Sequence, residues 1–206
     1  MTTQVEKEHY NFEKYGHVGR WVSYHHQLKE VLLCNPSSIL EIGVGDKVFG
    51  SYIKNNTTIS YTSFDTAEDL HPDIVGDITK PLPFGDTTFD VVCAFEVLEH
   101  IPFEQVEGAI REMVRVSKKG IVVSVPHFSH PLKFLLKIPL VKEIAVAFRI
   151  PHPKEHTFNG EHYWELGKKG YSVERLLTLL KKYGAIKKHF VPFGYQYHHF
   201  FVLEKK

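Results

Sequence analysis

The sequence has few cysteines and no long apolar run. Only two cysteines occur in 206 residues, Cys34 and Cys93, and Cys93 lies inside an apolar segment that resembles a strand. Two isolated cysteines exclude a disulfide framework and a cysteine zinc site, so we expect a reducing, cytoplasmic setting. No stretch reaches the roughly 18 apolar residues that a membrane span needs, and the N-terminus lacks an apolar signal core. We therefore expect a soluble protein without stable membrane insertion.

An excess of charge of one sign is also missing. Lysine and arginine number 25 and aspartate and glutamate 24, which leaves a formal net charge of +1. Such a chain has no strong positive field with which to attract nucleic acid. We expect no nucleic-acid partner, and the totals are compatible with a monomer or a homodimer.

What the chain does contain is an alternation of strand and helix patterns. Five segments rich in Val, Ile and Phe are mostly apolar on both faces, as buried parallel strands are: SILEIG, TISYTSFD, DIVGD, FDVVCAFE and GIVVSVP. Helical patterns cover residues 17–35, 48–55 and 103–120, and Gly120 is expected to end the last of these. Residues 66–72 are too few for a crossover helix, so a turn is expected there.

After the fifth strand the pattern is interrupted and then resumes. Residues 127–163 carry five histidines and four prolines around one apolar, basic stretch, which we interpret as an insertion over the sheet. A helix follows over residues 172–184, with Ser172 as its N-cap and Gly184 as its stop. Two final strands, AIKKHFVPF and YQYHHFFVLEK, are expected to form an antiparallel pair at the sheet edge.

The first predicted strand runs into a glycine-bearing turn. Gly43 and Gly45 have no Cβ, so a ligand can approach the main chain, and the helix that follows offers free N–H groups. Asp65 ends the second strand 20 residues after Gly45, where a carboxylate can accept both hydroxyls of a ribose. Asp77 follows the third strand and is expected at the same edge of the sheet. This arrangement predicts a nucleotide-type cofactor site.

The third glycine of a dinucleotide fingerprint is absent, and this decides between two cofactors. A nicotinamide dinucleotide needs a glycine three residues after Gly45, where Val48 stands. Glu41, two residues before Gly43, suits a cationic amine and a sulfonium better than a diphosphate. The residues therefore favour S-adenosylmethionine. An NAD-dependent oxidoreductase remains an alternative, supported by the spacing of Gly43, Gly45 and Asp65.

Taken in order, the segments LEIGVG, FD at 64–65 and GDITKPLPFGDTTFDVVCAFEVLEHI resemble class I S-adenosylmethionine-dependent methyltransferases, in the group with ubiquinone-type and small-molecule enzymes. The resemblance covers roughly residues 36–126. It implies an α/β fold, a Rossmann-like three-layer sandwich whose seven-stranded mixed sheet has an antiparallel last strand pair. It also implies S-adenosylmethionine as cofactor and S-adenosylhomocysteine as product.

The resemblance assigns roles to single residues as well. It implies that Glu41, Gly43 and Gly45 hold the methionine end of the cofactor and that Asp65 binds the ribose. Asp77 and the backbone of Ile78 would touch adenine, while Phe95 and Glu96 would line the sulfonium. The third glycine of the family falls at Lys47, where this chain departs from the pattern.

This reading divides the single domain, residues 1–206, into four parts. Residues 1–35 form an N-terminal helical cap, 36–126 the cofactor-binding core, 127–170 an insertion or lid over the active site, and 171–206 the closing helix and strand pair. In the cap, Arg20 is placed to clamp the carboxylate of the cofactor.

The acceptor is expected to be a small molecule or sugar-like, methylated at oxygen. FEVLEH after the fourth strand lacks the Pro-Pro-aromatic stretch of adenine- and amide-methylating enzymes, which argues against those acceptors. Cytosine C5 enzymes need a nucleophilic cysteine after this strand, whereas Cys93 lies within it. His127 and His130 follow the fifth strand at its ligand-facing end, and a pKa near 6.5 suits a catalytic base. Glu99 and His100 either pack beneath the loop or act in catalysis. A fold that binds the cofactor without catalysis is a second alternative, because methyl transfer needs no covalent nucleophile.

Fourteen histidines also raise the question of a metal. His152 and His156 have ligand spacing, but Pro151 and Pro153 exclude a regular helix through the pair, so no metal is expected. His156, His162, Tyr163 and Trp164 are candidates for an aromatic wall. Pro139 interrupts the apolar, basic residues 132–150, which favours a lid over a segment lying on a membrane surface.

Overall fold

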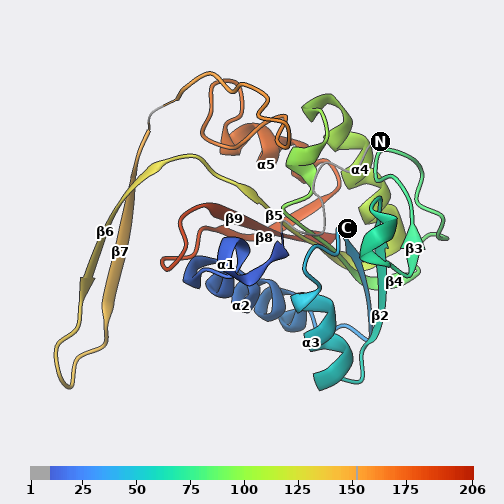
Figure 1. The fold of residues 1–206 in the computed structure, drawn as a ribbon, viewed down its shortest axis with the longest axis horizontal. Helices are drawn as coiled ribbons and strands as arrows, with labels where there is room; N and C mark the ends of the chain where they lie inside the picture. The colour runs from blue at the N-terminus through green and yellow to red at the C-terminus, as the bar shows by residue number, and fades with distance from the viewer. Residues whose placement is uncertain (1–9, 152) are drawn as a thin grey trace.

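The sheet predicted from the strand pattern is present in the computed structural model, which describes residues 10–151 and 153–206 (Figure 1). Its seven strands follow the spatial order β3-β2-β1-β4-β5-β9-β8. They are β1 (Ser38–Ile42), β2 (Ser60–Asp65), β3 (Ile74–Val75), β4 (Phe89–Phe95), β5 (Ser117–Pro126), β8 (Gly184–Phe190) and β9 (His198–Lys205). The first five are parallel, and β9 runs antiparallel to both β5 and β8. The expected mixed sheet with an antiparallel last pair is confirmed.

Helices cover both faces of this sheet. They are α1 (Phe12–Tyr15), α2 (Val18–Leu33), α3 (Val48–Asn56), α4 (Phe103–Val116) and α5 (Val173–Lys181), with 3-10 turns η2 (Glu68–Leu70) and η3 (Leu98–His100). In β4, Val91 and Cys93 pack with the apolar residues of α2 and α3, while Val92 and Ala94 pack with those of α4 and α5. Strand side chains alternate between the faces, so a strand covered on both sides is apolar throughout.

Several elements begin or end where local signals in the sequence predict. Helix α2 stops at Leu33, and Asn35 follows with a φ of 48°, a conformation that breaks the helix. Residues 66–73 contain only the turn η2 between β2 and β3. The side chain of Ser172 accepts a hydrogen bond from the Arg175 amide at 3.2 Å, which makes it the N-cap of α5.

Gly120 is not the helix terminus that the sequence analysis expects. Helix α4 ends at Val116, and Gly120 lies within β5 with a φ of 153°. A Cβ at this position would lie 1.9 Å from the carbonyl oxygen of Leu203 in β9. Gly120 is therefore required for the close approach of β9 to β5. Gly184, expected as a helix stop, is the first residue of β8.

The insertion contains a two-stranded hairpin, β6 (His130–Leu136) and β7 (Ile144–Ile150), paired antiparallel. Figure 1 shows it extending away from the main sheet. The chain then returns to the body of the protein, where Trp164, Glu165 and Leu166 are buried. His152 lies outside the described residues. Within the ranges that the structure covers, none of the helices has the length and apolar character needed to cross a membrane.

Candidate functional site

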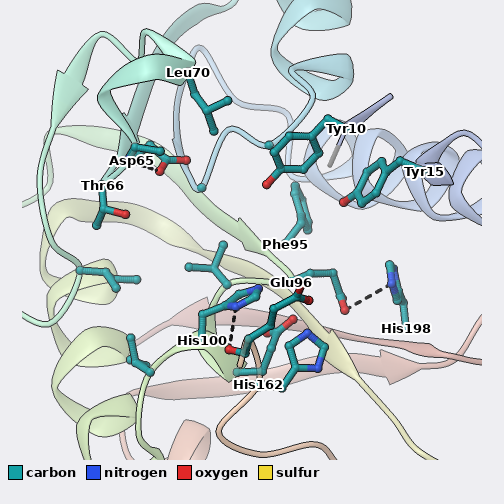
Figure 2. A pocket seen from close by; sticks show the side chains of 18 of the residues that line it. Tyr10, Tyr15, Asp65, Thr66, Leu70, Phe95, Glu96, His100, His162 and His198 are labelled. Atoms are coloured by element: carbon teal, nitrogen blue, oxygen red, sulfur yellow. Dashed lines mark hydrogen bonds and ion pairs between the residues drawn. The ribbon is translucent and has the colours of Figure 1, made fainter. Parts of the chain in front are cut away.

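A cavity of about 280 Å³ opens at the carboxyl ends of β1, β2 and β4 (Figure 2). Three parts of the chain line it: the N-terminal segment, the loops after the parallel strands, and the segment that returns from the hairpin. The lining residues include Tyr10, Tyr15, Arg20, Gly43, Gly45, Asp65, Leu70, Ile78, Phe95, Glu96, Glu99, His100, Glu161, His162, Tyr197 and His198. This is the crevice in which open α/β sheets bind ligands.

The glycine loop has a conformation that few other residues adopt. Gly43 and Gly45 have φ angles of 80° and 46°, and a Cβ on Gly43 would lie 2.3 Å from Cγ2 of Val97. Lys47 takes the same left-handed conformation, with a φ of 64°, at the N-cap of α3. The position at which the family places its third glycine therefore keeps the backbone shape that glycine favours, although a lysine stands there.

Asp65 is fixed at the edge of the cavity by main-chain amides. Its Oδ2 accepts a hydrogen bond from the Val44 amide at 2.7 Å, and its Oδ1 accepts one from the Ala67 amide at 2.9 Å. A carboxylate has about four acceptor sites, so these two bonds leave others for a ligand. The side chain is thus oriented before any ligand binds.

Two of the expected cofactor residues lie behind the cavity rather than on its wall. Oδ1 of Asp77 accepts hydrogen bonds from the amide and the hydroxyl of Thr79, at 2.8 and 2.7 Å, while its neighbour Ile78 lines the cavity. Glu41 is buried and accepts a hydrogen bond from the Tyr61 hydroxyl. Burial raises the pKa of Glu41 to about 8, opposed by that hydrogen bond.

At the end of β4, Glu96 has a φ of 56°, which is strained for a residue with a Cβ. Its Oε2 lies 3.3 Å from Nε2 of the buried His198, and its Oε1 has no hydrogen-bond partner among the described residues. Burial raises the pKa of Glu96 to about 7, and the nearby Arg20 guanidinium opposes the shift. The Cζ of Arg20 lies 4.0 Å from the centroid of the Tyr15 ring. Its buried Nε has no hydrogen-bond partner among the described residues.

A second group of ionisable side chains lies at the far end of the cavity. The Nδ1 of His162 lies 3.0 Å from Oε1 of Glu165, which also accepts a hydrogen bond from the Tyr197 hydroxyl at 3.0 Å. The Nδ1 of His100 lies 3.0 Å from the carbonyl oxygen of Glu161. Burial raises the pKa of Glu99, and the neighbouring Glu96 adds to the shift.

The segment that returns from the hairpin, here called the returning segment, brings His162 to this group. The amide of Tyr163 donates to the carbonyl of Glu99 at 2.8 Å, and the indole of Trp164 donates to the carbonyls of Leu98 and Ile101 at 3.1 and 3.2 Å. These bonds fix the segment against η3. Tyr163 itself is exposed, whereas Trp164 is completely buried.

His127 and His130 lie outside the residues that line the cavity. The Nδ1 of His127 lies 2.7 Å from Nη1 of Arg149 and 2.9 Å from Nδ1 of His199. Burial and the Arg149 charge lower the pKa of His127 to about 4, so it is neutral at pH 7. His130 is exposed at the start of β6. Neither histidine is placed to contact a molecule in the cavity.

Several residues of the wall escaped the sequence analysis, among them Tyr10, Leu70, Tyr197 and His198. The pair His198 and His199 inside an otherwise apolar strand was the available signal, because buried polar residues in a strand need partners. Tyr10 carried no signal of its own, since only the folded arrangement brings it over the glycine loop, where its ring lies 3.5 Å from a Cβ built on Gly45.

Residues 40–124 match the model of a family described as a methyltransferase domain. A search among curated proteins found no match. The fold is similar to that of a Pyrococcus horikoshii OT3 protein, with a TM-score of 0.59 and 16% identity over 98% of this chain and 100% of that one. The fold is also similar to that of the N-methyltransferase NodS from Bradyrhizobium japonicum WM9, crystallised with S-adenosylhomocysteine. The TM-score is 0.59 at 14% identity, over 98% of this chain and 94% of that one.

A third similar structure is the 1,6-didemethyltoxoflavin-N1-methyltransferase of Burkholderia thailandensis, also with bound S-adenosylhomocysteine. Its TM-score is 0.59 at 11% identity, over 89% of this chain and 77% of that one. At these identities the likeness concerns the fold, while the family match covers the strands and loops that form the cofactor end of the cavity. The chain therefore has the fold of class I S-adenosylmethionine-dependent methyltransferases, and its residues 40–124 match the methyltransferase-domain family.

Proposed function

We propose that this protein transfers a methyl group from S-adenosylmethionine to a hydroxyl oxygen of a small-molecule or sugar-like acceptor. One observation carries the proposal: a single cavity joins the glycine loop and Asp65 at one end to a buried group of carboxylates and imidazoles at the other. Phe95 and Glu96 lie between the two ends (Figure 2). Such a cavity offers adjoining places for a nucleoside cofactor and for a small acceptor.

The residues at the first end fit the cofactor. The oriented carboxylate of Asp65 suits the two ribose hydroxyls, and the loop at Gly43 and Gly45 admits a ligand close to the main chain. Ile78 provides an apolar wall for adenine. Arg20, with its unpartnered Nε, is placed for the carboxylate of the methionine end.

Glu41 and Asp77 support this end from behind in the proposal. Glu41 is joined to the Tyr61 hydroxyl beside Gly50 of α3, where a Cβ would lie 3.2 Å from its Oε2. Asp77 fixes the turn that presents Ile78. Both therefore act as positioning residues, unlike the direct contacts that the family resemblance implies.

When bound, the cofactor supplies a methyl group on a sulfonium, whose departure as a thioether needs no help from the protein. The protein has to align the acceptor oxygen and receive its proton. In the balanced reaction the new C–O bond forms as the C–S bond breaks with its electron pair on sulfur, and the hydroxyl proton leaves. Oε1 of Glu96, which has no partner among the described residues, is placed to accept that proton.

Two measurements test the proposal. Calorimetric titration is expected to show binding of S-adenosylhomocysteine and not of NAD, and the reverse result would favour the oxidoreductase. A ¹³C-methyl-labelled cofactor, incubated with metabolite and glycan fractions, is expected to give a methoxy carbon signal. An N-methyl signal would move the reaction to nitrogen, and cofactor binding without transfer to any fraction would support a non-catalytic protein.

A further inference from the structure

Glu99 has no compensating partner in its buried position. Its side chain is completely buried, and neither carboxylate oxygen has a hydrogen-bond partner among the residues that the structure describes. Burying a carboxylate without a partner is costly, and native proteins do so where a bound group supplies the missing interactions. Because Glu99 lines the cavity, such a group can reach it.

Two histidines lie beside Glu99. One ligand atom from each of Glu99, His100 and His162 lies within 4.8 Å of the other two. Atoms bound to one ion at about 2.1 Å lie at most about 4.2 Å apart, so small side-chain rotations would bring the three onto a common ion. Figure 2 shows the two imidazoles close together below Glu96, with ring centroids 5.1 Å apart.

The hydrogen bonds of both imidazoles select the tautomer that binds metals. A carbonyl oxygen only accepts, so the Nδ1–H of His100 donates a hydrogen bond to the carbonyl oxygen of Glu161. In the same way the Nδ1–H of His162 donates to the carboxylate of Glu165. In a neutral imidazole this places the lone pair on Nε2. Metal-bound histidines almost always donate their other ring N–H to a carboxylate or a carbonyl in this way. The Tyr197 hydroxyl in turn holds Glu165.

We propose that Glu99, His100 and His162 bind a divalent transition-metal cation in the acceptor end of the cavity. One carboxylate and two imidazoles suit Mn²⁺, Fe²⁺, Co²⁺ or Zn²⁺, whereas Mg²⁺ and Ca²⁺ prefer oxygen ligands alone. Three protein ligands leave coordination positions open for a substrate oxygen. The sequence analysis expects no metal because it considers His152 and His156, which are near in sequence; these three residues meet only through the returning segment.

The role of the cation rests on the proposed function. A hydroxyl oxygen of the acceptor that binds the cation would release its proton to Oε1 of Glu96 more readily, and it would be held in line for transfer. An acceptor with two neighbouring oxygens, such as a sugar diol, would fill two open positions. Metal binding itself does not depend on that role.

The test is a titration of the full-length protein, first treated with EDTA, with MnCl₂. Free Mn²⁺ is measured by electron paramagnetic resonance. We expect one site per chain, and an affinity at least about tenfold weaker in Glu99→Gln and in His162→Gln. Glu107→Gln and His25→Gln, at the protein surface away from the cavity, serve as matched controls and should bind Mn²⁺ like the wild type.

Thermal melting separates loss of the site from loss of the fold. Glu99→Gln removes an unpartnered buried carboxylate, so without metal it should melt no lower than the wild type. Mn²⁺ should raise the melting temperature of the wild type and not that of the variant. Equal Mn²⁺ binding by the wild type and Glu99→Gln would overturn the inference, as would a wild type that binds none of Mn²⁺, Co²⁺ and Zn²⁺.

One further variant distinguishes this inference from the proposed function. Asp65→Ala should bind S-adenosylhomocysteine weakly and Mn²⁺ normally, because the two sites use different residues. A wild type that binds Mn²⁺ through Glu99 but no S-adenosylhomocysteine would overturn the proposed function and leave the metal site standing. A wild type that binds S-adenosylhomocysteine but no metal would overturn the metal site and leave the proposed function standing.

Discussion

At the scale of single residues, the cofactor end of the cavity depends on one carboxylate. Asp65 joins the loop after β1 to the loop after β2 through the amides of Val44 and Ala67. We expect Asp65→Ala to weaken binding of S-adenosylhomocysteine by roughly 1–3 kcal/mol, the cost of removing a hydrogen-bonding partner from a ligand. Calorimetry measures this change. Asp69→Ala, an exposed aspartate of the neighbouring turn η2, is the control, and equal affinity in both variants would contradict the ribose assignment.

A separate prediction concerns Glu41 and the pH dependence of the free energy of unfolding. Its pKa is about 8 in the folded protein against an ordinary value of 4.5, because burial disfavours the charged form. Between these two values the folded chain keeps a proton that the unfolded chain has released, so the free energy of unfolding falls as pH rises through that interval. Glu41→Gln removes this contribution. Relative to the variant, the wild type should lose up to about 1.4 kcal/mol per pH unit.

Urea denaturation of the cofactor-free protein at pH 5.5, 6.5 and 7.5 measures that difference. The buried histidines titrate alike in both proteins, so their effects cancel when the two curves are subtracted. A difference between the wild type and Glu41→Gln that stays constant over the three pH values would show that the carboxyl is ionised throughout.

At the scale of elements, two glycines near each other in sequence are expected to respond in opposite directions. A Cβ at Gly120 in β5 would lie 1.9 Å from the Leu203 carbonyl oxygen, at a φ that other residues rarely adopt, whereas a Cβ at Gly108 in α4 would meet nothing within 4 Å. Gly120→Ala should lower the free energy of unfolding by about 2 kcal/mol or more. Gly108→Ala should raise it by about 0.5–1 kcal/mol, because alanine is the better helix former. Chemical denaturation of both variants checks the pair.

The elements themselves could be predicted where a local pattern determines them. Strand β4 is apolar on both faces because helices cover both faces, and Ser172 marks the start of α5 because it caps a helix amide. Gly120 misled the prediction because a glycine after a helical pattern is typical both of a helix end and of a close strand contact. Only the position of β9, distant in sequence, separates the two.

The candidate site was predictable on its cofactor side and not on its acceptor side. Gly43, Gly45 and Asp65 follow strands at fixed places, so parallel topology alone brings them to one edge. His162 reaches Glu99 and His100 only through hydrogen bonds of a segment more than 60 residues further along the chain. No spacing rule predicts such a contact.

At the scale of the whole molecule, the hairpin β6–β7 is structurally separate from the site. Its residues are largely exposed. Its contacts with the body include the hydrogen bonds of Arg149 with His127 and Gln196 and that of Lys133 with the carbonyl of Phe193. Among the residues that the structure describes, none of those lining the cavity belongs to either strand. Of residues 127–170, Glu161 and His162 line the cavity, whereas the hairpin would cover it only after a movement, so the interpretation of the whole segment as a lid stays a prediction.

Shortening the hairpin tests that prediction. Lys133 pairs with Ala147, so residues 134–146 can be replaced by Asn-Gly, a two-residue turn that suits antiparallel strands, while Arg149 and Lys133 keep their contacts. Because the removed residues contribute neither to the core nor to the cavity, we expect the affinity for S-adenosylhomocysteine to stay within about twofold, well below the tenfold change that 1.4 kcal/mol produces. The melting temperature should change by no more than about 2 °C, the shift that roughly 0.5–1 kcal/mol produces in a chain of this size. Calorimetry and thermal melting check both, and a much weaker affinity with an unchanged melting temperature would show that the hairpin closes over the bound cofactor.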